Sequence, residues 1–182
     1  MIEVEVKARI NDINSCISTF LDNGFVKEKY VEEIDTYYNS KLHDFRENDE
    51  ALRLRESKDL VSGKKEAFIT YKGKKLDTVS MARKELESAV EMADVVKQIL
   101  ESIGFEPVIP VEKTRVSLVK GNITACIDDV KGLGGFLELE IIVKDESLRE
   151  TALKDIEAVL GIAGLSMKDT VRKSYLSMLE DL

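Results

Sequence analysis

Charged residues in this sequence recur two positions apart, and in most cases an aliphatic residue separates them. The spacing occurs in five segments: Glu3/Glu5/Lys7, Arg53/Arg55, Arg83/Glu85/Glu87, Lys113/Arg115 and Glu138/Glu140. In a β-strand, side chains two apart lie on the same face, so each segment predicts a strand with one charged face. One such strand is typical of a sheet with a face in water. Five of them indicate a surface that binds a charged ligand.

The residue types on these faces suit a polyphosphate and its metal ion. The basic members are Lys7, Arg53, Arg55, Lys72, Arg83, Lys113 and Arg115. The acidic members are Glu3, Glu5, Glu85, Glu87, Asp128, Glu138 and Glu140. Arginine binds phosphate through a rigid fork of donors and lysine through a mobile charge, while clustered carboxylates prefer hard ions such as Mg²⁺ or Mn²⁺. The alternative is a network of structural ion pairs, each of which contributes little at a surface.

Strands and helices are predicted from the period of the apolar residues. Strands are expected at residues 1–10, 25–38, 51–55, 67–72, 81–88, 108–120, 123–130 and 136–143. Helices are expected between Asp12 and Gly24, from about residue 91 to Gly104, and at 148–160 and 170–182. The lysines at 64, 65, 74 and 75 are expected in solvated loops.

About eight strands, mostly in consecutive hairpins, favour an α+β fold built on an antiparallel β-barrel. The helices need apolar surface to pack on, and the strands supply it only if their charged faces point inward. We therefore expect a charged lumen with the helices packed outside. A helix-Gly-Phe-strand arrangement occurs twice, around Phe25 and around Phe105. It indicates one domain, residues 1–182, with two pseudo-equivalent halves at about 1–88 and 89–182.

Composition excludes several classes of protein. The formal net charge is −8 over 182 residues, which argues against a nucleic-acid groove. The first residues do not resemble a signal peptide, and no apolar run is long enough to span a membrane. Cys16 and Cys126 are interpreted as reduced thiols, and the single histidine, His43, gives little basis for a zinc site or a Ser-His-Asp triad. We expect a cytoplasmic protein without nucleic-acid or membrane partners; a homodimer is left open.

The order of the motifs resembles the CYTH family, the triphosphate tunnel metalloenzymes. Glu3-Val-Glu5-Val-Lys7 resembles the family's ExExK motif. The motifs that follow are Asp35-Thr-Tyr-Tyr38, Glu50-Ala-Leu-Arg-Leu-Arg55, Thr70-Tyr-Lys-Gly73, Arg83-Lys-Glu85, Glu112-Lys-Thr-Arg115, Asp128-Asp-Val-Lys-Gly-Leu-Gly134 and Phe136-Leu-Glu-Leu-Glu140. ExExK alone matches any charged strand, whereas the ordered set is specific and extends to about residue 143. Asp44-Phe45, residues 49–55 and the Thr-Tyr-Lys-Gly strand look most like the class IV adenylyl cyclase branch.

The resemblance implies an eight-stranded triphosphate tunnel and a role for each matching residue. It implies metal binding by Glu3, Glu5, Glu138, Glu140 and Asp128, with Mg²⁺ or Mn²⁺ as the ion. It implies triphosphate binding by Lys7, Arg53, Arg55, Lys72, Lys113 and Arg115, to which we add Arg83. The candidates for a direct role in catalysis are Asp128, Lys7 and Glu85.

Three functions are compatible with the resemblance. The first is a class IV adenylyl cyclase-like enzyme that converts ATP to cyclic AMP and pyrophosphate. The second is an inorganic or thiamine triphosphatase, in which water is the attacking group. The third is a non-catalytic module that binds a nucleotide or polyphosphate, although phosphate binding alone does not require both glutamate pairs.

The roles of three tyrosines stay open at this point. Tyr37 and Tyr38 could stack on a base or thiazole ring, but alternating aromatic residues in a strand usually belong to the core. Tyr175 lies in the expected last helix, which either caps the tunnel or only docks against the barrel.

Overall fold

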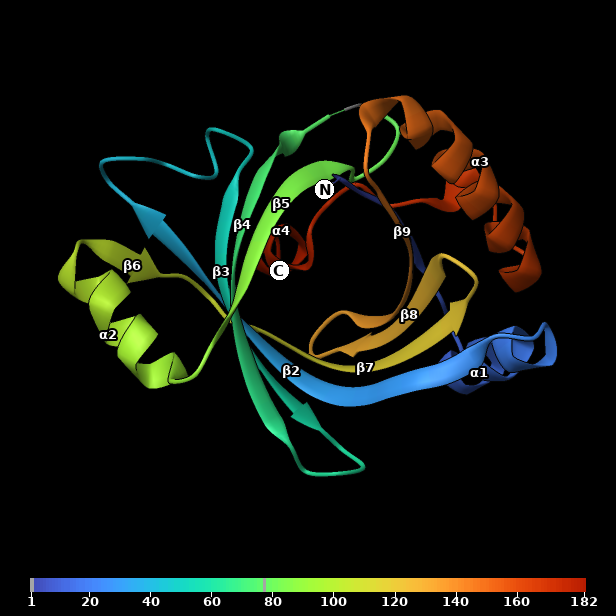
Figure 1. Cartoon of the computed structure of the whole chain (residues 1–182), viewed down its shortest axis with the longest axis horizontal. Coiled ribbons are helices and arrows are strands. Elements are labelled where there is room, and N and C mark those ends of the chain that lie inside the picture. Colours follow the sequence, from blue (N-terminus) through green and yellow to red (C-terminus); the bar gives the residue numbers. More distant parts are fainter. Residues whose placement is uncertain (1, 77) are drawn as a thin grey trace.

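The computed structural model describes residues 2–76 and 78–182, whose strands form a closed antiparallel ring (Figure 1). Within these residues the ring consists of β1 (Ile2–Arg9), β2 (Val26–Ser40), β3 (Ala51–Asp59), β4 (Lys65–Lys75), β5 (Arg83–Val90), β7 (Val111–Lys120), β8 (Ile123–Val130) and β9 (Gly134–Val143). The strand order is β1-β9-β8-β7-β2-β3-β4-β5, and β5 pairs with β1 to close the ring. A short strand, β6 (Phe105–Pro107), pairs with the end of β2. The predicted eight-stranded antiparallel barrel is confirmed.

Strand register places charged residues from different strands beside each other on the inner face. Glu5 pairs with Glu140 and Lys7 with Glu138 across β1 and β9. Arg115 pairs with Asp128 across β7 and β8. Because directly paired residues point to the same side of a sheet, the charged faces of separate segments combine into one inner surface.

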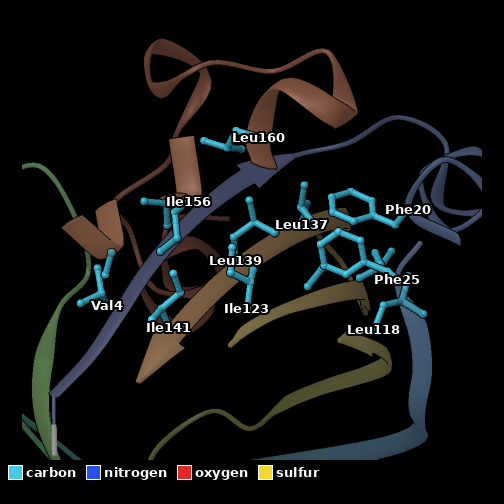
Figure 2. Packing of buried hydrophobic residues seen from close by; sticks show 14 of the residues in the cluster. Val4, Phe20, Phe25, Leu118, Ile123, Leu137, Leu139, Ile141, Ile156 and Leu160 are labelled. Carbon is cyan, nitrogen blue, oxygen red and sulfur yellow. The ribbon is translucent and has the colours of Figure 1, made fainter. Parts of the chain in front are cut away.

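The outer faces of β1 and β7–β9 carry the main hydrophobic core. Two helices, α1 (Ile13–Asp22) and α3 (Arg149–Leu160), cover this wall, and Figure 2 shows side chains of both helices against the strands. Phe20 of α1 is fully buried and meets Phe25 edge-on, with ring centroids 4.9 Å apart. Ile156 and Leu160 of α3 are also fully buried. Burial of this apolar surface holds the charged faces inward.

Local signals set the beginning and end of the first helix. Asp12 caps α1 by accepting a hydrogen bond from Ser15 N at 2.9 Å. Gly24 follows α1 with φ +82°, and Gly104 follows α2 (Ala93–Ser102) with φ +93°, a conformation that favours glycine. The strand after Gly24 has 15 residues and the strand after Gly104 has 3. The similarity is therefore local, and the division into two equivalent halves stays a prediction.

The second wall of the barrel has less helical cover. Helix α2 packs on β3, with Leu100 buried beside Tyr38 and Leu54. The expected apolar face of this helix is only partly buried, because Met92 and Ile103 are each 62% exposed. One side of α2 contacts the barrel and the adjacent apolar side faces solvent.

Several expected boundaries are wrong. Strand β3 continues to Asp59 because it pairs there with β2 and with the start of β4. Strand β4 continues to Lys75, which pairs with Arg83 of β5. The expected helix at 170–182 is shortened to α4 (Tyr175–Glu180). The first residues of the expected helix instead run alongside β1. Thr170 forms a β-bridge with Ala8, and Val171 N donates to Lys7 O at 2.6 Å. Three 3₁₀ turns, η1 (Glu146–Leu148), η2 (Gly161–Ala163) and η3 (Met167–Asp169), complete the described elements.

None of the helices in the described part of the chain is both long and apolar enough to cross a bilayer.

Candidate active site

The barrel lumen contains a cavity of about 220 Å³ whose walls are mainly charged. The residues predicted from the sequence that line this cavity are Glu3, Glu5, Lys7, Arg53, Arg55, Lys72, Arg83, Glu85, Lys113, Arg115, Glu138 and Glu140, and Glu87 lines it as well. They come from six strands, β1, β3, β4, β5, β7 and β9, and the ring brings them together. Asp128 is the one predicted site residue that does not line this cavity.

Two carboxylates of β2 hold the cations of one wall in place. Arg55 donates from Nε and Nη2 to the two oxygens of Asp35, at 2.6 and 2.7 Å. Lys113 Nζ lies 3.4 Å from Glu33 Oε2 and 3.7 Å from Asp35 Oδ2. Burial alone would raise the pKa of Asp35, but Arg55, Arg53 and Lys113 hold it well below its usual value. Asp35 is therefore ionised and orients these side chains.

Sequence reasoning did not select Glu33 or Asp35 as site residues. Glu33-Ile34-Asp35 has the same charge spacing as the five segments that were selected. That spacing was the signal that could have found both residues.

Asp128 lies behind the lumen and supports Arg115. Its side chain is fully buried and accepts hydrogen bonds from Arg115 Nε and Nη2, both at 2.6 Å, and from Tyr175 Oη at 2.9 Å. Both oxygens thus accept cationic or phenolic donors, and the metal-binding and catalytic roles predicted for Asp128 stay predictions. The longer side chain of Arg115, paired with it in the register, covers it from the cavity.

Three carboxylates from β1 and β9 form the one metal-compatible cluster that the described residues contain. Glu3, Glu5 and Glu140 each have an oxygen within 4.8 Å of the others. Burial raises the pKa of Glu3 to about 7, and repulsion from Glu85 and Glu5 adds to the rise against the opposing effect of Lys72. Burial and the neighbouring carboxylates also raise the pKa values of Glu5 and Glu140. An all-oxygen donor set with unbalanced negative charge fits a hard divalent metal ion.

Glu138 differs from this cluster in its partners. Its carboxylate lies 3.0 Å from Lys7 Nζ and accepts a hydrogen bond from Arg115 Nη2. Burial would raise the pKa of Glu138, but Lys7 and Arg115 hold it well below the usual value. Although Glu138 was predicted to bind metal, in this structure it neutralises two cations.

Arg83 is oriented mainly toward a loop. Its Nη1 donates to Asp49 O at 2.7 Å and to Gly73 O at 2.9 Å, and its Nη2 donates to Asp49 Oδ1 at 3.2 Å. The Lys75 side chain also binds Asp49, so the expectation of a solvated Lys75 is wrong. The guanidinium of Arg83 thus connects the loop at residues 41–50 to β4 through hydrogen bonds. Because these bonds use its donors, the predicted binding of phosphate by Arg83 has a weaker basis. Lys72, by contrast, pairs inside the lumen with Glu85 at 2.6 Å.

The model of the CYTH domain family matches residues 1–175. The chain belongs to the CYTH family.

Relatives in sequence and solved structures with a similar fold span nearly the whole chain. A Methanocaldococcus jannaschii protein named "Putative adenylate cyclase MJ0240" is 39% identical over 180 residues, which is 98% of each chain. "Adenylate cyclase CyaB" of Aeromonas hydrophila is 24% identical, over 98% of this chain and 88% of that protein. The PH1819 protein of Pyrococcus horikoshii has a similar structure, with TM-score 0.89, 33% identity and 98% of each chain covered. A Hippeastrum protein described as having a dominant triphosphatase activity shares the fold, with a TM-score of 0.66 and 13% identity. The match covers 99% of this chain and 95% of that chain.

Helix α4 of this CYTH chain lies across one end of the tunnel and brings Tyr175 to the lumen. In Figure 1 the helix appears within the outline of the strands, and its contacts confirm the position. The Tyr175 ring centroid is 4.3 Å from Lys7 Nζ and 5.3 Å from Lys113 Nζ. The sequence did not distinguish Tyr175 from its apolar neighbours, because Val171, Met178 and Leu179 fall on the same face of the expected helix. Tyr37 lines the lumen, whereas Tyr38 is buried in the core under α2.

Proposed function

We propose that this CYTH protein is a divalent-metal-dependent enzyme that acts on ATP as a class IV-type adenylyl cyclase. The observation that carries the proposal is one cavity in which phosphate-binding cations face the Glu3/Glu5/Glu140 cluster. A triphosphate requires both kinds of group, since its own charge is neutralised by cations and by the metal it brings. Relatives named as adenylate cyclases support the choice of reaction.

The basic residues of the lumen are proposed to bind the triphosphate. Arg53 and Arg115 are buried and already oriented by carboxylates, so their binding geometry needs little reorganisation. Lys7, Lys72 and Lys113 add charge from three other strands, and Arg55 completes the group. Mg²⁺ or Mn²⁺ at the glutamate cluster would neutralise phosphate charge and polarise the phosphorus under attack.

In the proposed reaction the ribose 3′-hydroxyl oxygen attacks the α-phosphorus, and pyrophosphate leaves. The hydroxyl proton needs an acceptor, and Glu85 is the catalytic candidate carboxylate that lines the cavity. Asp128 becomes a positioning residue that acts through Arg115, because its oxygens are held away from the lumen. Lys7 is proposed to contact phosphate from its site beside Glu138.

The alternative, a triphosphatase, uses the same lumen with water in place of the hydroxyl. The cations and glutamates bind the part that ATP and inorganic triphosphate share, so they serve either reaction. A non-catalytic binding module is supported less well, because phosphate binding alone does not need three buried carboxylates that repel one another.

Product analysis tests the proposal. Purified protein is incubated with ATP or inorganic triphosphate, with Mg²⁺, Mn²⁺ or excess EDTA. We expect cyclic AMP and pyrophosphate from ATP, with loss of both in EDTA. Orthophosphate without cyclic AMP would replace the cyclase with a triphosphatase, and metal-dependent binding without turnover would leave only the binding module.

Matched variants connect the product analysis to the lumen. Glu140→Gln removes one carboxylate of the cluster, while Glu112→Gln removes an exposed carboxylate that pairs with Lys131 on the outside. We expect only the first to abolish metal-dependent turnover.

A further inference from the structure

One edge of β5 is open beyond the short pairing with β1. Strand β1 pairs with β5 at Arg83 and Lys84, and β4 pairs with the other edge of β5. Among the described residues, no strand pairs with the β1-facing edge of residues 86–90, and no backbone hydrogen bond from outside the sheet reaches them. Residues 86–89 are also exposed. An unpaired strand edge presents N–H and C=O groups that pair readily with another strand.

The outer face of this edge is apolar. Leu86 and Val90 lie on the outer face of β5, because they alternate with Glu85 and Glu87, which line the lumen. Leu86 is 60% exposed although it lies in the middle of a strand. The open edge therefore combines unpaired backbone with an exposed apolar side chain, and both are features of a protein interface.

The start of α2 continues this apolar surface. Met92 and Val95 are exposed and begin the apolar stripe that α2 presents to solvent. Lys97 lies on the opposite side of α2 and pairs with Glu56, which is next to β2. The stripe is therefore on the side of α2 toward β4 and β5, and its first residues follow directly after β5.

The sequence of the edge can pair with a second copy of itself. In a two-fold antiparallel pair, residues at equal distances from the axis lie opposite each other, so the position of the axis sets every contact. With the axis at Ser88, Leu86 lies opposite Val90, and Glu87 lies opposite Ala89. Moving the axis by one residue in either direction would place Glu87 opposite another glutamate, which is destabilising. The register about Ser88 joins apolar residues and keeps like charges apart.

The two ends of the edge are complementary in charge. Lys84 precedes the open residues, and Glu91 and Asp94 follow them; all three are exposed. In an antiparallel pair, the acidic end of one copy comes near Lys84 of the other, and the two-fold axis repeats the contact. Because β5 ends at Val90, the partner's chain leaves the edge before it reaches the part that β1 occupies.

We propose that this protein forms a two-fold homodimer in which the β5 edges of two copies pair antiparallel about Ser88. Residues 86–90 of each copy join the two barrels into one continuous sheet. Leu86, Val90 and Met92 supply the apolar contacts on its outer face. The second copy is the occupant because the edge is complementary to itself in register, in apolar surface and in charge. This assembly does not depend on which reaction occurs in the lumen.

A cysteine at the axis tests the register. Opposed residues of an antiparallel pair have Cα atoms about 4.5–5.5 Å apart, which is within the range that a disulfide spans. We expect mild oxidation to link the Ser88→Cys protein into a covalent dimer. Ser147→Cys, at an exposed position of η1, is the matched control and should stay unlinked. The natural cysteines are both buried and do not compete.

Analytical ultracentrifugation over a range of protein concentrations tests the assembly. We expect the unmodified protein to sediment with twice the mass of one chain. Leu86→Lys should raise the dissociation constant of the dimer about a hundredfold, because each copy places an ammonium group opposite Val90 of the other. Leu148→Lys, at an η1 residue that is 49% exposed, is the control and should leave the dimer unchanged. Thermal unfolding checks that both variants fold.

Three outcomes would overturn the proposal. The first is a monomer at every concentration. The second is a dimer that survives Leu86→Lys or fails to link through Ser88→Cys, because the copies then meet elsewhere or in another register. The third is an assembly larger than a dimer, which would show open-ended association. None of these measurements uses a triphosphate, so failure of the proposed lumen function would not change their result.

Discussion

Glu138 and Glu140 stand two residues apart on β9 but have opposite electrostatic surroundings. Glu138 lies between Lys7 and Arg115, whereas Glu140 lies near Glu3 and Glu5 and has one longer cationic contact, with Arg115 at 3.8 Å. A buried carboxylate with cationic partners stabilises the fold, and removal of one partner leaves a buried charge uncompensated. A buried carboxylate beside other carboxylates is repelled by them, and this repulsion destabilises the fold until a cation binds. The two residues should therefore respond oppositely to the same substitution.

We expect Glu138→Gln to lower the free energy of unfolding by about 3 kcal/mol in EDTA, because Lys7 and Arg115 lose a buried anion. Glu140→Gln should leave that free energy unchanged or raise it, because it relieves repulsion. Urea unfolding of both variants at pH 7 without metal measures the difference. Equal destabilisation by both would contradict the distinct roles of the two glutamates.

Asp35 should make the free energy of unfolding depend on pH in the acidic range. Its folded-state pKa lies well below the usual 3.8, so its contribution is complete above pH 3.8 and is lost as the pH falls below that value. Asp35→Asn should cost about 3–5 kcal/mol at pH 7, because Arg55 and Arg53 lose their buried partner. The difference from the unmodified protein should shrink at pH 3.

Urea unfolding at pH 7 and pH 3 checks this dependence, with Asp22→Asn at the exposed end of α1 as the control. A difference that stays constant between the two pH values would show that Asp35 does not titrate as its ion pairs require.

At the scale of the elements, the start of β9 packs closely against the end of β1. A Cβ on Gly135 would lie 2.8 Å from Ile10 O and 3.1 Å from a carbon of Ile13. Ile10 N donates to Gly135 O at 3.0 Å, so the two segments cannot separate without loss of that hydrogen bond. Glycine at this position allows β1 to turn directly into α1.

We expect Gly135→Ala to destabilise the fold by about 1–3 kcal/mol, the usual cost of overpacking. Gly161→Ala is the control, because nothing lies within 4 Å of its Cβ and its φ is −59°. That substitution should be neutral or stabilise by about 0.4–1 kcal/mol through the unfolded state. Thermal unfolding of the two variants makes the comparison, and a neutral Gly135→Ala would show that the contact relaxes freely.

At the scale of the whole molecule, the ring has one short seam. Strands β1 and β5 pair through two residue pairs, Ile2 with Lys84 and Glu3 with Arg83, whereas β1 and β9 pair along eight. Helices α1 and α3 pack on the long-paired wall, and α2 packs on β3. Within the described residues the seam therefore has few paired backbone groups, which is a feature of a region that opens locally.

Hydrogen exchange should show the seam directly. We expect amides of residues 83–86 to exchange faster than those of 123–130 in the free protein, and triphosphate with Mg²⁺ to slow the former, because Glu3, Lys72 and Glu85 line the lumen beside the seam. Exchange measured by mass spectrometry over matched peptides tests both points. Uniform protection around the ring would contradict a weak seam.

The sequence by itself determined the face on which each charge lies, because β-strand geometry repeats every two residues and depends only on local order. The spacing at Glu3/Glu5/Lys7 and Glu138/Glu140, with apolar residues between, was sufficient to predict the inward charged surface. The helix boundary at Gly24 was equally local. The motif order indicated the family and with it the closed ring.

Tertiary structure alone decided which partner each inward side chain meets. Asp128 lies behind Arg115, and Arg83 turns to the Asp49 loop. Glu138 lies against both Lys7 and Arg115, whereas Glu140 has a single, longer contact with Arg115 at 3.8 Å. These choices depend on how strands far apart in sequence are staggered and how far long side chains reach across the lumen. The strand period determines the side of the sheet but not the neighbour, so the metal cluster follows only from the folded barrel.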